Sequence, residues 1–194
     1  YWQFREAVLG IGDMCRALDT PVTGGNVSFY NEDGDRAVFP TPVIGMVGYM
    51  EDIAHSTSIA YSNPGDYILA LGSINGRLGG SEYLHMIHGK TEGPVPNLNI
   101  ELEIAVQELT LNLIKKGVVK SAHDLSDGGL AVNISESIFS SGDGIGAEID
   151  IKRKLRNDEL LFGECQSVII ITIEKDKIQT VISAAQELDV YTQT

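Results

Sequence analysis

The second part of the sequence alternates apolar runs with amphipathic stretches, and this alternation limits the chain to few architectures. Four apolar runs have the length of strands: 67–71, 118–123, 145–151 and 167–173. Three amphipathic stretches have the spacing of helices: 97–116, 128–139 and 177–188. A further helix is expected to begin at Ser81, which suits an N-cap. Elements in this order predict an α+β or α/β sandwich, with a mixed sheet and covering helices.

The first part is patterned differently. Apolar residues recur at three- to four-residue spacing over about residues 2–18, which predicts an amphipathic helix. Strands are expected after it, around 26–30, 36–39 and 43–50. Residues 52–65 are small, polar and interrupted by proline and glycine, so we predict a linker there. The predicted domains are therefore 1–51 and 66–194.

Composition excludes some classes of protein. The net charge of −13 and the absence of a Lys/Arg-rich run argue against a nucleic-acid-binding surface. The two cysteines, Cys15 and Cys165, lie far apart and form neither a disulfide framework nor a zinc pattern. No apolar run approaches the roughly 20 residues that span a bilayer. We therefore expect a cytoplasmic protein that binds neither nucleic acid nor membrane.

The stretch from Pro21 to Glu32 is the part least explained by folding alone. In a strand over 26–30, alternation would turn Val27 and Phe29 toward a core. The opposite face would then carry three polar side chains: Asn26, Ser28 and Tyr30. Two glycines just upstream would let backbone N–H groups approach a phosphate. The pattern predicts a nucleotide-phosphate corner with an oxygen ligand for Mg²⁺, but it also fits a glycine-rich hairpin edge.

A second polar region, 121–130, leads from a strand into a helix. Asp124 and Asp127 could hold a metal, and Gly128 could let a phosphate approach the helix N-terminus. Alternatively, Ser126 or Asp127 caps the helix, Asp127 interacts favourably with its dipole, and the glycines allow close packing. His123 is either a base or a hydrogen-bonded packing residue. Because no thiolate-stabilising group is identifiable near Cys165, we expect that cysteine to be a packing residue.

Five motifs, in this order, carry a resemblance to a known family: 20–32, 40–48, 78–84, 123–130 and 161–167. Together they closely resemble the second half of the synthetase subunit of the phosphoribosylformylglycinamidine synthase family. The resemblance runs from end to end of the chain. It implies the last third of an aminoimidazole-ribonucleotide-synthetase-type N-terminal domain, followed by most of the C-terminal-type domain. It also implies that the chain is a piece of a larger protein.

The family implies an activity and partners. In it, ATP activates the amide oxygen of formylglycinamide ribonucleotide, and ammonia derived from glutamine displaces phosphate to give the amidine of purine biosynthesis. The resemblance thus implies ATP and Mg²⁺ as cofactors. It implies three protein partners: a glutaminase subunit, a small bridging subunit and the first half of the synthetase.

Matching the motifs residue by residue implies that Gly25 contacts ATP, Asn26 ligates Mg²⁺ and Ser28 contacts the substrate. The catalytic residues of the family belong to its first half, so none is expected here. A pseudo-symmetric site, functional or merely structural, is implied for six residues: His123, Asp124, Asp127, Gly128, Glu164 and Gln166. Cys165 stands where the motif usually has serine, which weakens a binding role for it.

Two other interpretations stay open. The chain could belong to another ATP-dependent enzyme of the same superfamily, such as aminoimidazole-ribonucleotide synthetase, selenophosphate synthetase or a thiamine-phosphate kinase. It could also be a non-catalytic structural or docking module. An isolated piece of the synthetase is expected to be inactive on its own.

Overall fold

The structure, a computed structural model, describes residues 1–28, 32–142, 144–151 and 154–193. The chain divides into two units, Tyr1–Glu51 and Asp52–Thr194. The division falls beside the predicted linker, whose role as a linker stays a prediction.

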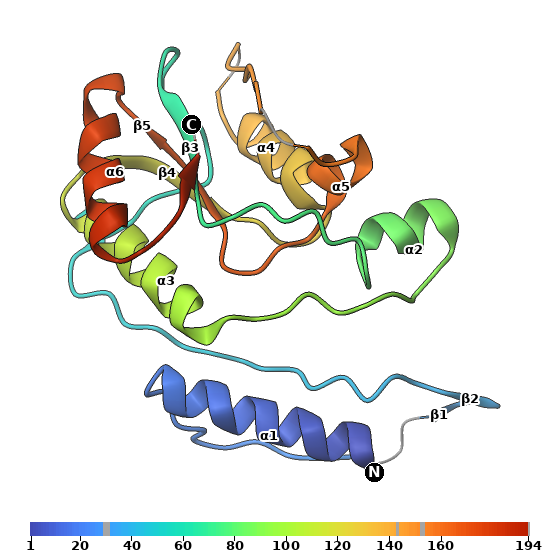
Figure 1. The fold of residues 1–194 in the computed structure, drawn as a ribbon. Coiled ribbons are helices and arrows are strands. Elements are labelled where there is room, and N and C mark those ends of the chain that lie inside the picture. Colours follow the sequence, from blue (N-terminus) through green and yellow to red (C-terminus); the bar gives the residue numbers. More distant parts are fainter. Residues whose placement is uncertain (29–31, 143, 152–153, 194) are drawn as a thin grey trace. The chain divides into compact units, whose positions relative to one another are not determined.

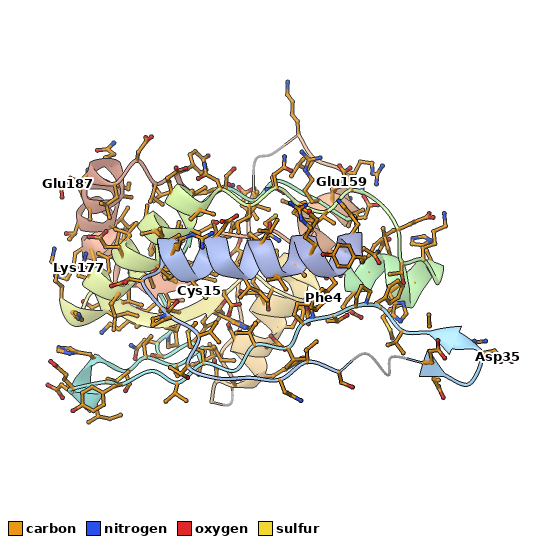
Figure 2. All side chains as sticks on the ribbon, turned by 90° about the horizontal axis from the view of Figure 1, so that it is seen from below. Phe4, Cys15, Asp35, Glu159, Lys177 and Glu187 are labelled. Carbon is orange, nitrogen blue, oxygen red and sulfur yellow. The ribbon has the colours of Figure 1, made fainter. Side chains whose placement is uncertain are left out.

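The described residues of the first unit form one long helix and one small hairpin. Helix α1 (Trp2–Ala17) confirms the predicted helix. Strands β1 (Glu32–Asp33) and β2 (Arg36–Ala37) pair antiparallel around a turn with Gly34 at φ +61°. Figure 2 labels Phe4 on α1 and Asp35 in the turn of the hairpin.

The strand predicted over 43–50 is wrong. These residues have no regular structure, and Val43, Val47 and Tyr49 are 92%, 99% and 89% exposed. A strand requires a neighbour to which its N–H and C=O groups bond. None of the other described residues pairs with residues 43–50. An apolar sequence was therefore not sufficient to form a strand there.

The second unit is built on a four-stranded sheet with the order β4-β5-β3-β6. Its strands are β3 (Tyr67–Leu71), β4 (Val119–Asp124), β5 (Ile169–Ile173) and β6 (Thr192–Gln193). All pairs of these strands are antiparallel. Among the described residues, a parallel pairing occurs only as an isolated bridge between Ser58 and Ser121 of β4, so the predicted mixed character reduces to that bridge.

Helices cover both faces of the sheet (Figure 1). On one face, α3 (Ile100–Lys115) and α6 (Ile178–Glu187) pack on Leu69, Leu71 and Ile171. On the other face, α4 (Gly129–Phe139) and α5 (Asn157–Phe162) pack on a cluster that includes Ala70 and Ile170. This confirms the predicted sandwich of sheet and helices.

Local signals set several helix ends. The Ser81 hydroxyl accepts a hydrogen bond from the Leu84 backbone N at 3.3 Å and caps α2 (Glu82–His88), as predicted. The Asn99 side chain caps α3 in the same way. Short 3₁₀ turns occur at Ile53–His55 and Lys175–Lys177. No helix in the described parts of the chain is long and apolar enough to cross a membrane.

The strand predicted over 145–151 is also wrong. These residues have no regular structure and are largely exposed. They alternate as a strand would, but among the described residues none of the strands pairs with them. The helix α5, at residues 157–162, was not predicted. It is too short for its periodicity to be recognised in the sequence.

Candidate functional site

The residues predicted to bind ATP, Mg²⁺ and substrate lie on an open segment of the first unit. Gly25, Asn26 and Ser28 are exposed and have no regular structure. A Cβ added at Gly25 would meet no other atom within 4 Å, so the backbone there is accessible. The binding roles of these three residues stay predictions.

The predicted burial of Val27 is wrong, since its side chain is 59% exposed. Residues 26–28 pair with no strand among the described residues, so no sheet provides a core on one side of them. Phe29 and Tyr30, which the same pattern covered, lie outside the described residues.

In the second unit, three of the glycine-containing motifs meet at Glu164, and we call this place the Glu164 junction. It consists of residues 75–82, 126–129 and 162–165. Glu164 Oε1 accepts hydrogen bonds from the backbone N of Glu82 at 2.8 Å and of Gly128 at 2.9 Å. The backbone N of Glu164 donates to the Arg77 carbonyl at 2.9 Å. One residue thus bonds to both other segments.

Glycines let the three segments approach backbone to backbone. Gly129 has φ +68°, and a Cβ there would lie 2.8 Å from the Gly163 carbonyl oxygen. A Cβ on Gly163 would lie 2.7 Å from Gly76 Cα. No real Cβ tolerates such distances, so each of these contacts requires glycine. This supports close packing as the reason for the glycine-rich spacing.

Cys165 completes the junction as a packing residue. Its side chain is 3% exposed, and its Sγ lies 3.3 Å from both the backbone N and the Oδ1 of Asn75. Neither contact supplies a positive charge that would stabilise a thiolate. Phe162, also in the junction, stacks its ring on that of Tyr83, with centroids 4.9 Å apart.

The electrostatics of the Glu164 junction explain why a carboxylate occupies it. Helix N-termini carry unpaired N–H groups and a partial positive charge, which favour an anion. The Glu164 carboxylate supplies that anion at the starts of both α2 and α4. A phosphate reaching Gly128 would have to displace this side chain.

His123 faces α4 rather than the Glu164 junction. Its Nδ1 lies 3.2 Å from the Asn133 carbonyl oxygen and 3.3 Å from Ser137 Oγ. Its Nε2 lies 3.3 Å from Glu136 Oε2, and its side chain is mostly buried. These contacts describe a hydrogen-bonded packing residue between β4 and α4.

The remaining predicted residues are not assembled into a centre. Asp124, Asp127 and Gln166 are exposed. Across the described residues, no group of three or more His, Cys, Asp or Glu side chains could hold a metal ion. Of the six pseudo-site residues, hydrogen bonding joins Gly128 to Glu164.

Sequence reasoning missed the other partners in this region. Asn75 and Arg77 bond to Cys165 and Glu164, and Ser167 Oγ donates to Glu103 Oε2 at 2.7 Å. The one available signal was the glycine-rich composition of 72–80, which indicates close contacts but not with which segment.

The fold and the Glu164 junction define an α+β domain whose glycine-rich motifs meet at the starts of two helices. Residues 63–193 match the family described as AIR synthase related protein, C-terminal domain. The chain belongs to this family.

The predicted resemblance is confirmed by relatives along nearly the whole chain. The chain is 48% identical over 181 residues to the phosphoribosylformylglycinamidine synthase subunit PurL of Alkaliphilus metalliredigens, covering 93% of the chain and 24% of that protein. It is 44% identical over 186 residues to the subunit of the same name from Moorella thermoacetica, covering 96% of the chain and 25% of that protein. The chain thus spans about a quarter of the length of these relatives.

Solved structures show the same fold. The chain matches T. maritima PurL complexed with FGAR with a TM-score of 0.57 and 17% identity, over 72% of this chain and 25% of that one. It matches T. maritima PurL complexed with ATP with a TM-score of 0.54 and 17% identity, over 72% and 22%.

Proposed function

We propose that this chain is a segment of an ATP-dependent amidoligase of purine biosynthesis. The whole enzyme would convert formylglycinamide ribonucleotide, ATP and ammonia to formylglycinamidine ribonucleotide, ADP and phosphate. The observation that carries the proposal is the 48% identity to a phosphoribosylformylglycinamidine synthase subunit over 93% of the chain. Because the chain spans a quarter of such relatives, the remaining site residues would come from elsewhere in the enzyme.

In this enzyme, the chain would contribute the exposed segment at Gly25, Asn26 and Ser28. The open backbone at Gly25 suits a phosphate of ATP, and the Ser28 hydroxyl can hydrogen-bond the ribonucleotide. The Asn26 carboxamide oxygen fits Mg²⁺, which prefers oxygen ligands, as one ligand of several. A bound Mg²⁺ would offset phosphate charge.

The chemistry has two steps, and the chain would position the reactants in both. The amide oxygen of the substrate first attacks the γ-phosphorus of ATP, and the bond to ADP breaks. Ammonia then adds to the activated carbon, and the phosphate leaves with the former amide oxygen. Ser28 would hold the ribonucleotide and Gly25 the nucleotide, so that the two meet in one orientation.

The second unit would serve as scaffold in this half of the enzyme. The backbone N–H group of Gly128, which the sequence suggested for a phosphate, donates to the Glu164 carboxylate, and so does that of Glu82. This supports a structural role for the copy of the motif in this chain, with His123 as a packing residue.

The enzyme would receive its ammonia from a partner. A structure described as PurLQS from Thermotoga maritima, with a TM-score of 0.53 to this chain, supports a multi-subunit assembly. We infer that a glutaminase subunit and a small bridging subunit complete the complex, in the cytoplasm.

Two measurements test the proposal. In the complete enzyme, Asn26→Ala should lower turnover about 100-fold, because a lost Mg²⁺ ligand weakens charge stabilisation worth several kcal/mol. Asn97→Ala, at an exposed asparagine of the second unit, is the matched control and should change nothing. Unchanged kinetics of the Asn26 variant would refute the site assignment alone, whereas a complete enzyme without amidoligase activity would refute the function.

Calorimetric titration of ATP·Mg²⁺ into the 194-residue chain, with and without Asn26→Ala, tests whether the chain alone binds the nucleotide. Binding that Asn26→Ala abolishes would show that the segment holds phosphate without the rest of the enzyme. Absence of binding to either protein would assign the chain, taken alone, a structural or docking role.

A further inference from the structure

The sequence contains one Asn–Gly pair, Asn75–Gly76, and it lies in the Glu164 junction. In such a pair the backbone nitrogen of the glycine can attack the amide carbon of the asparagine, because the glycine has no side chain to obstruct the approach. The asparagine then loses ammonia without any enzyme. None of the roles described above involves this reaction.

The nucleophile of the reaction, the Gly76 nitrogen, is available. Gly76 lies outside the helices and strands. Among the described residues, no acceptor bonds to its backbone N–H. Most backbone N–H groups in folded proteins have a partner, which would have to be given up before the nitrogen could react. At Gly76, ring closure therefore breaks no hydrogen bond to this nitrogen.

The amide group that is attacked is accessible and weakly held. Asn75 is exposed, so water reaches its side chain. Its Oδ1 lies 3.3 Å from Cys165 Sγ, and a thiol is a weak hydrogen-bond donor. The same thiol has a second acceptor, the Gly163 carbonyl oxygen, at 3.9 Å. The Asn75 side chain can therefore leave Cys165 and turn toward the Gly76 nitrogen at little cost.

We propose that Asn75 is a site of spontaneous deamidation and that its contact with Cys165 limits the rate. The Gly76 nitrogen gives up its proton and bonds to Asn75 Cγ, while the bond from Cγ to Nδ2 breaks and ammonia leaves. Water then opens the succinimide ring at one of its carbonyl groups. The product is aspartate, or isoaspartate, in which the backbone runs through the side-chain carbon.

The isoaspartate form alters the Glu164 junction, because it lengthens the backbone by a methylene group directly before Gly76. The surroundings of Gly76 leave no room for this extra length. A Cβ added to Gly76 would lie 3.0 Å from Glu159 Cβ, and a Cβ on Gly163 would lie 2.7 Å from Gly76 Cα. Deamidation thus loosens the contact between residues 75–82 and 162–165, and this does not depend on the proposed function.

The test follows individual asparagines of the purified 194-residue chain during incubation at mildly alkaline pH. Peptide mass spectrometry detects the exchange of amide for acid, and labelling by isoaspartyl methyltransferase detects isoaspartate. Asn75 should convert at least about tenfold faster than Asn97, which is exposed but followed by leucine. Asn63 precedes proline, whose nitrogen carries no hydrogen, and should not convert. Equal rates at Asn75 and Asn97, or no conversion of Asn75, would overturn the proposal.

Variants of cysteine separate the effect of the fold from that of the Asn–Gly pair itself. Cys165→Ala removes the sulfur from the Oδ1 and the backbone N of Asn75 and should speed its conversion about threefold. Cys165→Ser restores a donor and should slow the conversion again. Cys15→Ala, in the first unit, is the matched control and should leave the rate unchanged. If Cys165→Ala and Cys15→Ala convert at equal rates, the contact with Cys165 does not limit the reaction and that part of the proposal is wrong.

Discussion

The two units have similarly apolar sequences but bury them differently. In the described part of Tyr1–Glu51, no residue is buried, and α1 has none despite its amphipathic pattern. In Asp52–Thr194, Leu71 and Ile171 are 0% exposed between the sheet and helices α3 and α6. An apolar pattern therefore indicates which face can be buried, but burial requires an opposing layer.

The largest expected effect contrasts a core residue with an exposed one. Leu71→Ala should lower the free energy of unfolding of the second unit by about 2–5 kcal/mol, because it leaves a cavity in the core. Val47→Ala, at a 99% exposed position of the first unit, should change the free energy of unfolding of the chain by less than about 0.5 kcal/mol. Urea unfolding followed by circular dichroism measures both. A large effect of Val47→Ala would mean that the first unit has a core after all.

A second contrast separates backbone conformation from close packing. Gly72 has φ +99°, and a Cβ there would lie 2.0 Å from the Ser167 carbonyl oxygen. Gly80 has φ +72° but open space around it. Gly80→Ala should cost only the left-handed conformation, about 1–2 kcal/mol. Gly72→Ala should cost clearly more in the same urea experiment, and equal costs would show that Ser167 moves aside freely.

The Glu164 junction should contribute less than the core. Glu164→Ala leaves the N–H groups of Glu82 and Gly128 without their acceptor, which should cost about 1–3 kcal/mol. Glu187→Ala, at an exposed position, should stay within about 0.5 kcal/mol. If Glu164→Ala equally leaves the unfolding curve unchanged, water replaces the carboxylate and it is not structurally required.

The smallest effect should depend on pH. Burial raises the pKa of the Tyr61 hydroxyl above its ordinary value of 10.0. Below the ordinary pKa the hydroxyl is protonated in both the folded and the unfolded chain, so the contribution of the buried neutral hydroxyl to stability is fully present. As the pH rises through the ordinary and then the raised pKa, the unfolded chain ionises first and stability is lost.

Melting temperatures measured from neutral to alkaline pH test this loss. Tyr61→Phe should flatten the alkaline fall, because it removes the ionising group. Tyr49→Phe, at an exposed residue of the first unit, should leave the profile as it is. Identical profiles for both variants would contradict the assignment to Tyr61.

Elements with strong local signals were predictable. The strand over 67–71 and the cap at Ser81 follow from an apolar run and from side-chain chemistry within a few residues. The strands over 43–50 and 145–151 failed because pairing depends on a neighbour elsewhere, which a local pattern does not contain. The candidate site, too, was predictable only in part. The exposed glycine pair was visible in the sequence, whereas the meeting of residues 75–82, 126–129 and 162–165 was not.

The sequence by itself determined the family, the helical and strand periods, and the glycine-rich motifs, because these depend on residues close together in the chain. Only the tertiary structure decided that Glu164 bonds the starts of α2 and α4 and that His123 packs on α4. The reason is that these contacts join residues far apart in the chain, and their partners are chosen by packing of the sheet and its helices rather than by local propensity.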